Sequence, residues 1–285
     1  MKIKGKTILI IALLLTLEGG LPILGQARIG EDEKLLQEAK LLIFDKNWSE
    51  AEKKLAVLVN NHPKSGYYSQ ALFYLGKCQS EQSGKEKAAL GSFEAFLKRP
   101  DRPQGLVEEA EIAIIDLAFC LFSQGQKEYS RLLQDRLSSP NRVIRYYAAM
   151  KMSYLKDKDL AGQALPVLLK LIETEKDQEL VDRARIAILR ISPRALKDVP
   201  DRPAREGLRL LKIRVYEKGK KVPSLSMNLP LALADLAIQA ISEEEKAKIK
   251  EKGYDLDRII SDLARAKEKL VRIEEDGNII EIWIE

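Results

Sequence analysis

The fold of this 285-residue chain is decided by the stretches ALFYLGKC at residues 71–78 and AALGSFEAF at residues 88–96. In both stretches, apolar residues recur at the three- and four-residue spacing of an amphipathic helix. The second stretch ends at Arg99-Pro100, and proline cannot continue a helix because it lacks a backbone N–H. The two stretches therefore predict a pair of helices that pack as a hairpin.

A similar pair of helices is expected before this hairpin. One face of each helix is apolar, formed by Leu35, Ala39 and Leu42 on the first and by Ala51, Leu55 and Leu58 on the second. We expect Ser49 to cap the second helix by accepting a hydrogen bond from its first free N–H groups, and Pro63 to end it. A third, degraded unit has Leu117-Ala118 in the place of Leu75-Gly76.

These three units resemble tetratricopeptide repeats. The residues that carry the resemblance are Ala39, Ala51, Leu55 and Pro63 in the first unit and Leu75-Gly76 in the second. The resemblance implies stacked helical hairpins over residues 28–139, with a concave face built mainly from the first helix of each hairpin. Stacked repeats bury their apolar surface only against their neighbours.

By that register, the concave face would display four candidate peptide-binding residues: Lys40, Phe44, Phe73 and Lys77. Aromatic rings beside ammonium groups suit an extended peptide that carries an acidic feature. The alternative is that Phe44 and Phe73 only pack between helices. The register also places Cys78 and Cys120 at equivalent positions of neighbouring first helices, where helix spacing favours two unpaired thiols.

A different helical pattern begins after Pro140. The segment 141–149 opens a helix, the segment 164–172 supplies its partner, and the segment 179–187 repeats the opening about 38 residues after the first. Arg145 and Arg183 occupy matching places. This pattern resembles HEAT repeats, in which the arginine usually connects the loop to the neighbouring repeat. We therefore expect HEAT-like hairpins over residues 140–197, stacked on the tetratricopeptide-like array.

Residues 198–206 are expected to form a linker to a small α+β domain at residues 207–285. Residues 208–216 and 222–229 predict a strand pair, and residues 269–274 and 279–284 predict a closing hairpin around Asp276-Gly277. Three helices are expected between the hairpins. They begin at Pro230, at Ser242 with Glu245 as a capping box, and at Leu256, the last running to about Ala266.

This order resembles a small domain at the N-terminus of some bacterial envelope-stress proteins, which has been grouped with short oligomerisation (SHOCT-like) modules. The resemblance is carried by residues 212–215, 228–231, 253–256 and 276–285. It implies an envelope context and self-association through this domain. The fold class expected for the whole chain is mainly α, an α-solenoid followed by a small α+β domain with two β-hairpins.

The first residues have the layout of a secretory signal peptide. Lys2, Lys4 and Lys6 precede an apolar run from Thr7 to Leu17, and Gly25-Gln26-Ala27 offers small residues for cleavage after Ala27. The run is shorter than the roughly 20 residues of a membrane span. We therefore expect export to the periplasm or cell surface, with residues 1–27 removed. The alternative is that they are retained as an N-terminal anchor, which would be the only membrane contact.

Composition argues for a binding protein. The 48 basic and 43 acidic residues are interleaved, which is typical of solvated helix faces rather than of a nucleic-acid-binding surface, so we expect no nucleic-acid partner. No motif for a catalytic nucleophile, metal or phosphate is present, and the one histidine, His62, lacks companions. We expect no catalytic residues, no metal and no cofactor.

The function expected from these features is a non-enzymatic scaffold of the bacterial cell envelope, which binds protein partners through its repeats. Two alternatives stay open. The chain is either a regulatory module of sigma/anti-sigma type envelope-stress signalling, with a self-associating C-terminal domain, or an accessory cell-wall enzyme.

Overall fold

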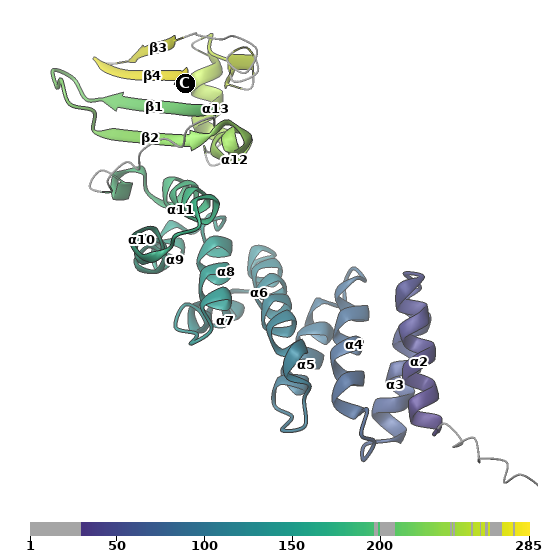
Figure 1. The fold of residues 1–285 in the computed structure, drawn as a ribbon. Coiled ribbons are helices and arrows are strands. Elements are labelled where there is room, and N and C mark those ends of the chain that lie inside the picture. Colours follow the sequence, from purple (N-terminus) through teal and green to yellow (C-terminus); the bar gives the residue numbers. More distant parts are fainter. Residues whose placement is uncertain are drawn as a thin grey trace, which may run out of the picture.

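The computed structural model describes residues 30–196, 199 and 209–285, apart from residues 240, 242, 252, 257, 260–261, 263–269 and 276. Helical hairpins stack one after another in chain order, an array that we call the staircase, and a four-stranded sheet lies at the C-terminal end (Figure 1). The chain is therefore mainly helical with a small α+β domain, and the predicted fold class is confirmed.

The helices of the staircase alternate between two rows. The first helices of the hairpins, which we call the A row, are α2 (Glu31–Phe44), α4 (Tyr68–Ser80), α6 (Val107–Ser123), α8 (Arg142–Met152) and α11 (Gln178–Ile191). Their partners, the B row, are α3 (Trp48–Asn61), α5 (Glu86–Leu97), α7 (Ser130–Arg136) and α10 (Leu165–Thr174). Short connecting elements are η1 (Gln104–Leu106), η2 (Lys127–Tyr129), α9 (Lys158–Gly162) and η3 (Pro193–Leu196). The A-row helices begin at residues 31, 68, 107, 142 and 178, so successive repeats have similar lengths of 35–39 residues.

The α4–α5 hairpin packs around the glycine that the sequence singled out. A Cβ atom added to Gly76 would lie 3.0 Å from two ring atoms of Phe93. Phe73 meets Phe93 and Phe96 edge-to-face, with ring centres 5.7 and 5.5 Å apart, the geometry that aromatic quadrupoles favour. The close approach of α4 and α5 therefore depends on a residue without a side chain.

The expected cap at Ser49 is wrong. Helix α3 begins one residue earlier, at Trp48, and its N-cap residue is Asn47, which makes no side-chain cap hydrogen bond. The turn before it contains Lys46 with a positive φ of 57°, and Asn47 N donates to Leu42 O at 2.8 Å. This tight turn aligns the start of α3 before Ser49 is reached. The helix ends at Asn61, just before Pro63 as predicted.

The helices expected after Pro140 form where the sequence placed them. Asn141 caps α8 and Asp177 caps α11, each through its side-chain oxygen. Arg145 donates to the carbonyl of Ser139 at 2.5 Å, in the loop from the preceding hairpin. Arg183, at the matching place, instead bonds Glu179 within its own helix. The loop-connecting role expected of both arginines therefore holds for Arg145 only.

The two predicted β-hairpins join into one antiparallel sheet. Its strands are β1 (Leu210–Tyr216), β2 (Leu225–Pro230), β3 (Leu270–Glu275) and β4 (Asn278–Ile284), in the order β2-β1-β4-β3. Between the hairpins lie η4 (Leu231–Leu233), α12 (Ala234–Gln239) and α13 (Glu243–Glu251). Strand β2 begins at Leu225, three residues later than predicted, and Val222 is exposed, because the preceding Pro223 cannot donate to a ladder.

The sheet is joined to the staircase by a shared core. Leu196 of η3, Met227 and Leu229 of β2, and Leu233 belong to the same buried cluster as the apolar residues of α8, α10 and α11. Met227 and Leu229 are 1% and 0% exposed. A second cluster, which contains Leu211, Ala234, Ile282 and Ile284, lies within the sheet domain. The C-terminal domain therefore packs directly on the last A-row helix.

Several expectations fall on residues outside the described part of the chain. These are the signal segment at 1–27, nearly all of the linker at 198–206, Ser242 of the capping box and most of the helix from Leu256 to Ala266.

Candidate functional site

The four residues predicted to bind a peptide do not form one surface. Phe73 is 1% exposed and packs among the rings of the α4–α5 core, so its assignment to the binding face is wrong and the packing alternative holds. The cause is its helical register, which turns the ring toward α5. Phe44, the last residue of α2, is 86% exposed.

The two predicted lysines bridge neighbouring A-row helices. Lys40 Nζ lies 3.4 Å from Gln70 Oε1 and 5.1 Å from the centre of the Tyr74 ring, both on α4. Lys77 Nζ lies 2.7 Å from Glu109 Oε1 on α6. Both ammonium groups therefore already have partners, and these contacts are part of the stacking of the array.

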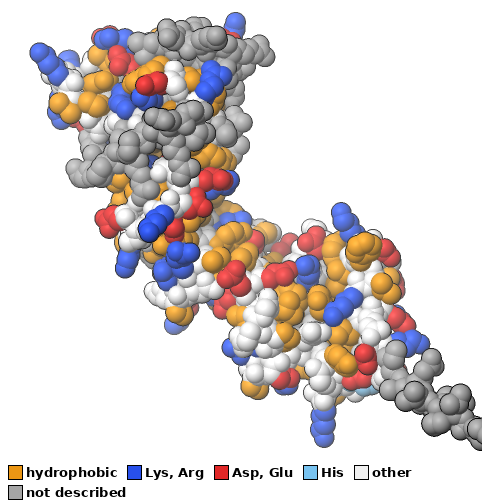
Figure 2. Space-filling view, in the orientation of Figure 1, with side chains coloured by type: hydrophobic (Ala, Val, Ile, Leu, Met, Phe, Trp, Pro, Cys, Tyr) orange, Lys and Arg blue, Asp and Glu red, His pale blue; other side chains and the backbone are white. Residues whose placement is uncertain are grey.

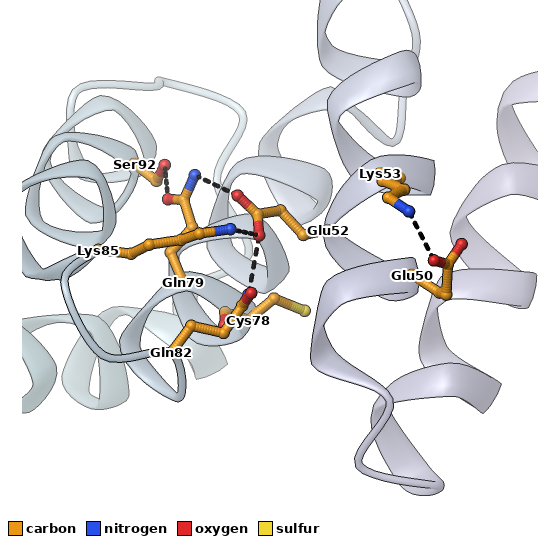
Figure 3. Close-up of polar contacts among 8 residues, drawn as sticks. All are labelled: Glu50, Glu52, Lys53, Cys78, Gln79, Gln82, Lys85 and Ser92. Atoms are coloured by element: carbon orange, nitrogen blue, oxygen red, sulfur yellow. Dashed lines mark hydrogen bonds and ion pairs between the residues drawn. The ribbon is translucent and has the colours of Figure 1, made fainter.

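B-row helix α3 is joined to the next hairpin by a polar cluster around Glu52 (Figure 3). The Glu52 carboxylate accepts hydrogen bonds from Lys85 at 2.5 Å and from Gln82 at 2.8 Å. The side-chain oxygen of Gln79 accepts a hydrogen bond from Ser92 Oγ at 2.7 Å. Burial alone would raise the pKa of Glu52, but these hydrogen bonds outweigh it and the pKa is lowered. The cluster fixes the orientation of one repeat on the next.

A wide opening lies on the A row, further along the chain. It is a groove of about 630 Å³ between α6, α8, α11 and α12, which we call the α8 groove. This volume is within the usual range for a ligand pocket. Val143, Tyr147 and Lys151 follow one another on α8 at a spacing of four residues, which places them on one helix face, and Tyr154 lies two residues after the helix ends.

The lining of the α8 groove is mostly apolar and aromatic. Phe119, Tyr146, Tyr147 and Tyr154 contribute rings, while Val143, Met150, Leu180, Ile186 and Leu236 contribute aliphatic surface. Val143 and Tyr154 are 44% and 50% exposed. Large apolar side chains that remain open to solvent in a concave surface are typical of a binding site.

Four cations line the same groove, and three of them are paired. Arg142 meets Glu175 at 3.2 Å, Lys151 meets Asp116 at 2.7 Å, and Arg183 meets Glu179 at 2.8 Å. Asp116 also accepts the Tyr147 hydroxyl at 2.8 Å. The pKa of Tyr147 is raised to about 12, mainly by burial and to a lesser extent by this hydrogen bond to Asp116. The phenol therefore stays protonated at neutral pH.

The fourth cation, Arg190, has no carboxylate partner among the described residues. Its guanidinium lies 3.9 Å from the centre of the Tyr154 ring. Its two terminal nitrogens donate over long distances of 3.4 Å, one to Ser153 Oγ and the other to the carbonyl of Leu236. Within the described residues its Nε has no hydrogen-bond partner. Burial lowers the pKa of Arg190, and the contact with Tyr154 partly offsets this effect. The guanidinium stays charged because arginine does not deprotonate in proteins.

The sequence reasoning missed this groove although a signal for it exists. Arg142, Tyr146, Met150 and Tyr154 recur at a spacing of four residues, which is the spacing of side chains that share one helix face. That segment was interpreted only as repeat packing. The contributions of α6 and α12 could not be found in this way, because they depend on how distant segments pack.

Other chemical candidates are few in the described part of the chain. Cys78 and Cys120 are both free, the first buried and the second partly buried, which confirms that they are unpaired. His62 Nε2 lies 4.0 Å from Glu31 Oε2. Within the described residues, no group of three or more His, Cys, Asp or Glu side chains is placed to hold a metal ion.

The surface chemistry agrees with the interleaved charges of the sequence. On the visible face of the molecule, Lys and Arg side chains alternate with Asp and Glu side chains along the repeats, without a continuous field of one sign (Figure 2). None of the described helices combines the length and the apolar character needed to cross a membrane.

Two protein families match parts of the chain. Residues 70–101, which contain α5 and all but the first two residues of α4, match a tetratricopeptide repeat family. Residues 209–283, which contain the sheet except for the last residue of β4, match the C-terminal domain of YvlB-like proteins. Neither match bears on the HEAT-like resemblance of residues 140–197, which stays a prediction. Comparisons with curated proteins and with solved structures found no match.

Proposed function

We propose that this protein is a non-catalytic scaffold of the bacterial cell envelope, exported from the cytoplasm, that binds other proteins through its helical repeats. The tetratricopeptide match supports a role in protein–protein interaction, and the YvlB-like match supports an envelope context. Export is supported by the sequence of residues 1–27, which resembles a signal peptide.

The observation that carries the proposal is the α8 groove. It lies on the A row, which is the row that lines the concave face in tetratricopeptide arrays, and it offers apolar and aromatic side chains to solvent in a concavity of about 630 Å³. Such surface is costly to leave exposed, and aromatic side chains with arginine are enriched where proteins bind one another.

Photocrosslinking in cells that express the protein tests this proposal. A photoreactive phenylalanine analogue replaces Val143 in the α8 groove or, as a control, Val57 on the B-row helix α3, which is 40% exposed. The two positions have similar exposure and differ in the row that carries them. We expect a crosslinked envelope protein from position 143 and none from position 57. Crosslinks to protein from neither position would overturn the scaffold proposal.

A second candidate function, a self-associating regulatory module, is favoured by one observation on the sheet. Lys212, Arg214 and Trp283 share the face of the sheet opposite the Leu211–Ile282–Ile284 cluster, and Arg214 lies 5.4 Å from the Trp283 ring centre. Light scattering tests it by giving the molar mass of the intact protein and of a Trp283→Ala variant. A monomer at all concentrations would exclude this candidate.

A further inference from the structure

We infer that the α8 groove binds an extended peptide segment in which an apolar side chain is followed closely by a carboxylate, and that Arg190 receives this carboxylate. The inference rests on the proposed function, because it names the partner chemistry of the same groove. The expected occupant is a peptide segment of another protein.

The apolar part of the ligand is indicated by the floor and walls of the groove. Tyr146 and Met150 of α8 and Leu180 and Ile186 of α11 all line it. Two of the polar groups in the lining are already engaged, since the Tyr147 hydroxyl and Lys151 both bond Asp116. A sugar ligand needs several free hydrogen-bonding groups, whereas an aliphatic or aromatic side chain needs apolar contact area.

The carboxylate is indicated by Arg190. Its guanidinium is held at the edge of the groove by stacking on Tyr154, and its Nε has no partner within the described residues. Nε itself is closed to solvent, and the hydrogen bonds of the two terminal nitrogens are long, at 3.4 Å. A ligand carboxylate would therefore accept charge-assisted hydrogen bonds from these terminal nitrogens. The three other cations already have acidic partners, so Arg190 is the one whose pairing the ligand would complete.

The ligand would also contact both parts of the molecule. Leu236 belongs to α12 of the C-terminal domain and lines the groove, and its carbonyl accepts a hydrogen bond from Arg190. A peptide in the groove therefore lies against α8 and α11 on one side and against α12 on the other. Its binding should stabilise the junction between the repeats and the sheet, because a ligand stabilises the folded state that it binds.

The probe is a library of random twelve-residue peptides displayed on phage. The target is the protein purified in the form that accumulates in cells expressing it. We expect the selected sequences to share an aromatic or large aliphatic residue within three positions of Asp or Glu. A synthetic copy of one selected peptide should lose affinity by about tenfold or more when that acid is changed to its amide, because a charge-assisted hydrogen bond is lost.

Two variants at Val143 separate charge from shape. Val143→Gln and Val143→Glu place nearly the same volume in the groove, but only glutamate repels an acidic ligand. We expect Val143→Glu to weaken peptide binding by about tenfold or more relative to Val143→Gln at low salt, and the difference to shrink as salt rises. Val57→Glu, on the other row, should leave binding unchanged. Arg190→Met should abolish the difference between the acidic peptide and its amide copy.

The results separate this inference from the proposed function. If the selected peptides share no acid, or if Val143→Glu binds them like Val143→Gln, the inference fails while the scaffold stands. Binding of purified cell-wall glycan fragments that Val143→Glu abolishes, with no peptide selected, would also overturn it. If no peptide is selected and position 143 yields no crosslinked protein, both proposals fail.

Discussion

At the scale of single residues, the helical hairpins depend on a few positions where size is decisive. Gly76 permits the contact between α4 and α5, and the Phe93 ring beside it is 2% exposed and packed against Phe73. Gly91, in contrast, has no atom within 4 Å of an added Cβ. The same amino acid therefore has opposite consequences at two places in one hairpin.

Gly76→Ala should lower the free energy of unfolding by about 1 kcal/mol, because overpacking against a fixed ring exceeds the roughly 1 kcal/mol that alanine gains over glycine in a helix. Gly91→Ala, the matched control, should raise it by up to about 1 kcal/mol. Urea unfolding of both variants checks the prediction. An unchanged or higher stability of Gly76→Ala would mean that the Phe93 ring shifts to admit the added methyl group at little cost.

The two thiols should differ in reactivity. Burial, with a smaller contribution from the Glu52 carboxylate, raises the pKa of Cys78 from 9.0 to about 12, whereas Cys120 is only half-buried. At pH 8 we expect one thiol per chain to react rapidly with a disulfide reagent and the other only on unfolding. Cys120→Ala should remove the rapid phase, and two rapid thiols would contradict the prediction.

A pH dependence follows from the same shift. Because the folded-state pKa of Cys78 is raised, its protonated form contributes full stability below the ordinary thiol pKa, and this contribution is lost as pH rises from about 9 toward 12. The stability difference between the natural protein and Cys78→Ala should therefore decrease over that interval. Urea unfolding at pH 8 and pH 10 measures it.

At the scale of elements, each hairpin is fixed to the next by side chains that reach from one helix to another. At the turn after α5, Asp101 accepts hydrogen bonds from Arg99 at 2.9 and 3.1 Å and from the buried Ser69 hydroxyl at 2.7 Å. Ser69 lies on α4, so this turn is held against the first helix of its own hairpin. These hydrogen bonds lower the pKa of Asp101 to about 2, and the bond from Arg99 has the largest effect.

Acid should loosen this turn. A carboxyl whose folded-state pKa is depressed contributes stability above its ordinary pKa of 3.8 and loses it as pH falls toward 2. Asp101→Asn should therefore reduce the fall in thermal stability between pH 4 and pH 2. The matched control is Asp45→Asn, which changes an exposed turn aspartate. Equal acid sensitivity of both variants and the natural protein would exclude a role for Asp101.

The elements themselves were largely predictable from the sequence, and their ends and contacts were not. Apolar spacing located the helices from α2 to α11, and the Asp-Gly signal located the closing hairpin, because both patterns are local. Ser49 failed as a cap because the turn at Lys46 and Asn47 starts α3 early. Phe73 was placed on the wrong face because one helical register allows both a core and a surface position until the partner helix is known.

At the scale of the whole molecule, one hydrophobic core crosses the junction between the repeats and the sheet. Met227 of β2 shares a cluster with residues of α11, whereas Ile282 of β4 belongs to the cluster inside the sheet domain. The expected linker at residues 198–206 suggested two separable units. The packing instead makes the last A-row helix and β2 depend on each other, which only the folded arrangement reveals.

Met227→Ala should lower stability by about 2–5 kcal/mol, as expected for truncating a buried methionine. It should also speed amide hydrogen exchange in α11, since the cavity lies in the shared cluster. Ile282→Ala, 7% exposed in the other cluster, should speed exchange in the sheet and leave α11 protected. Unchanged exchange in α11 for Met227→Ala would show that the two parts are energetically independent.

The position of the sheet also determines where the array can change in length. A stack of hairpins has two apolar ends, and each end needs a cover that is polar on its outer side. Here β2 and η3 occupy the apolar side of α11, so the sheet closes the stack at that end. Duplication of a hairpin such as residues 68–101 would lengthen the array and leave this closure intact. An insertion after α11 would separate the sheet from the surface it covers, so we expect variation in repeat number to be confined to the part of the chain before α11.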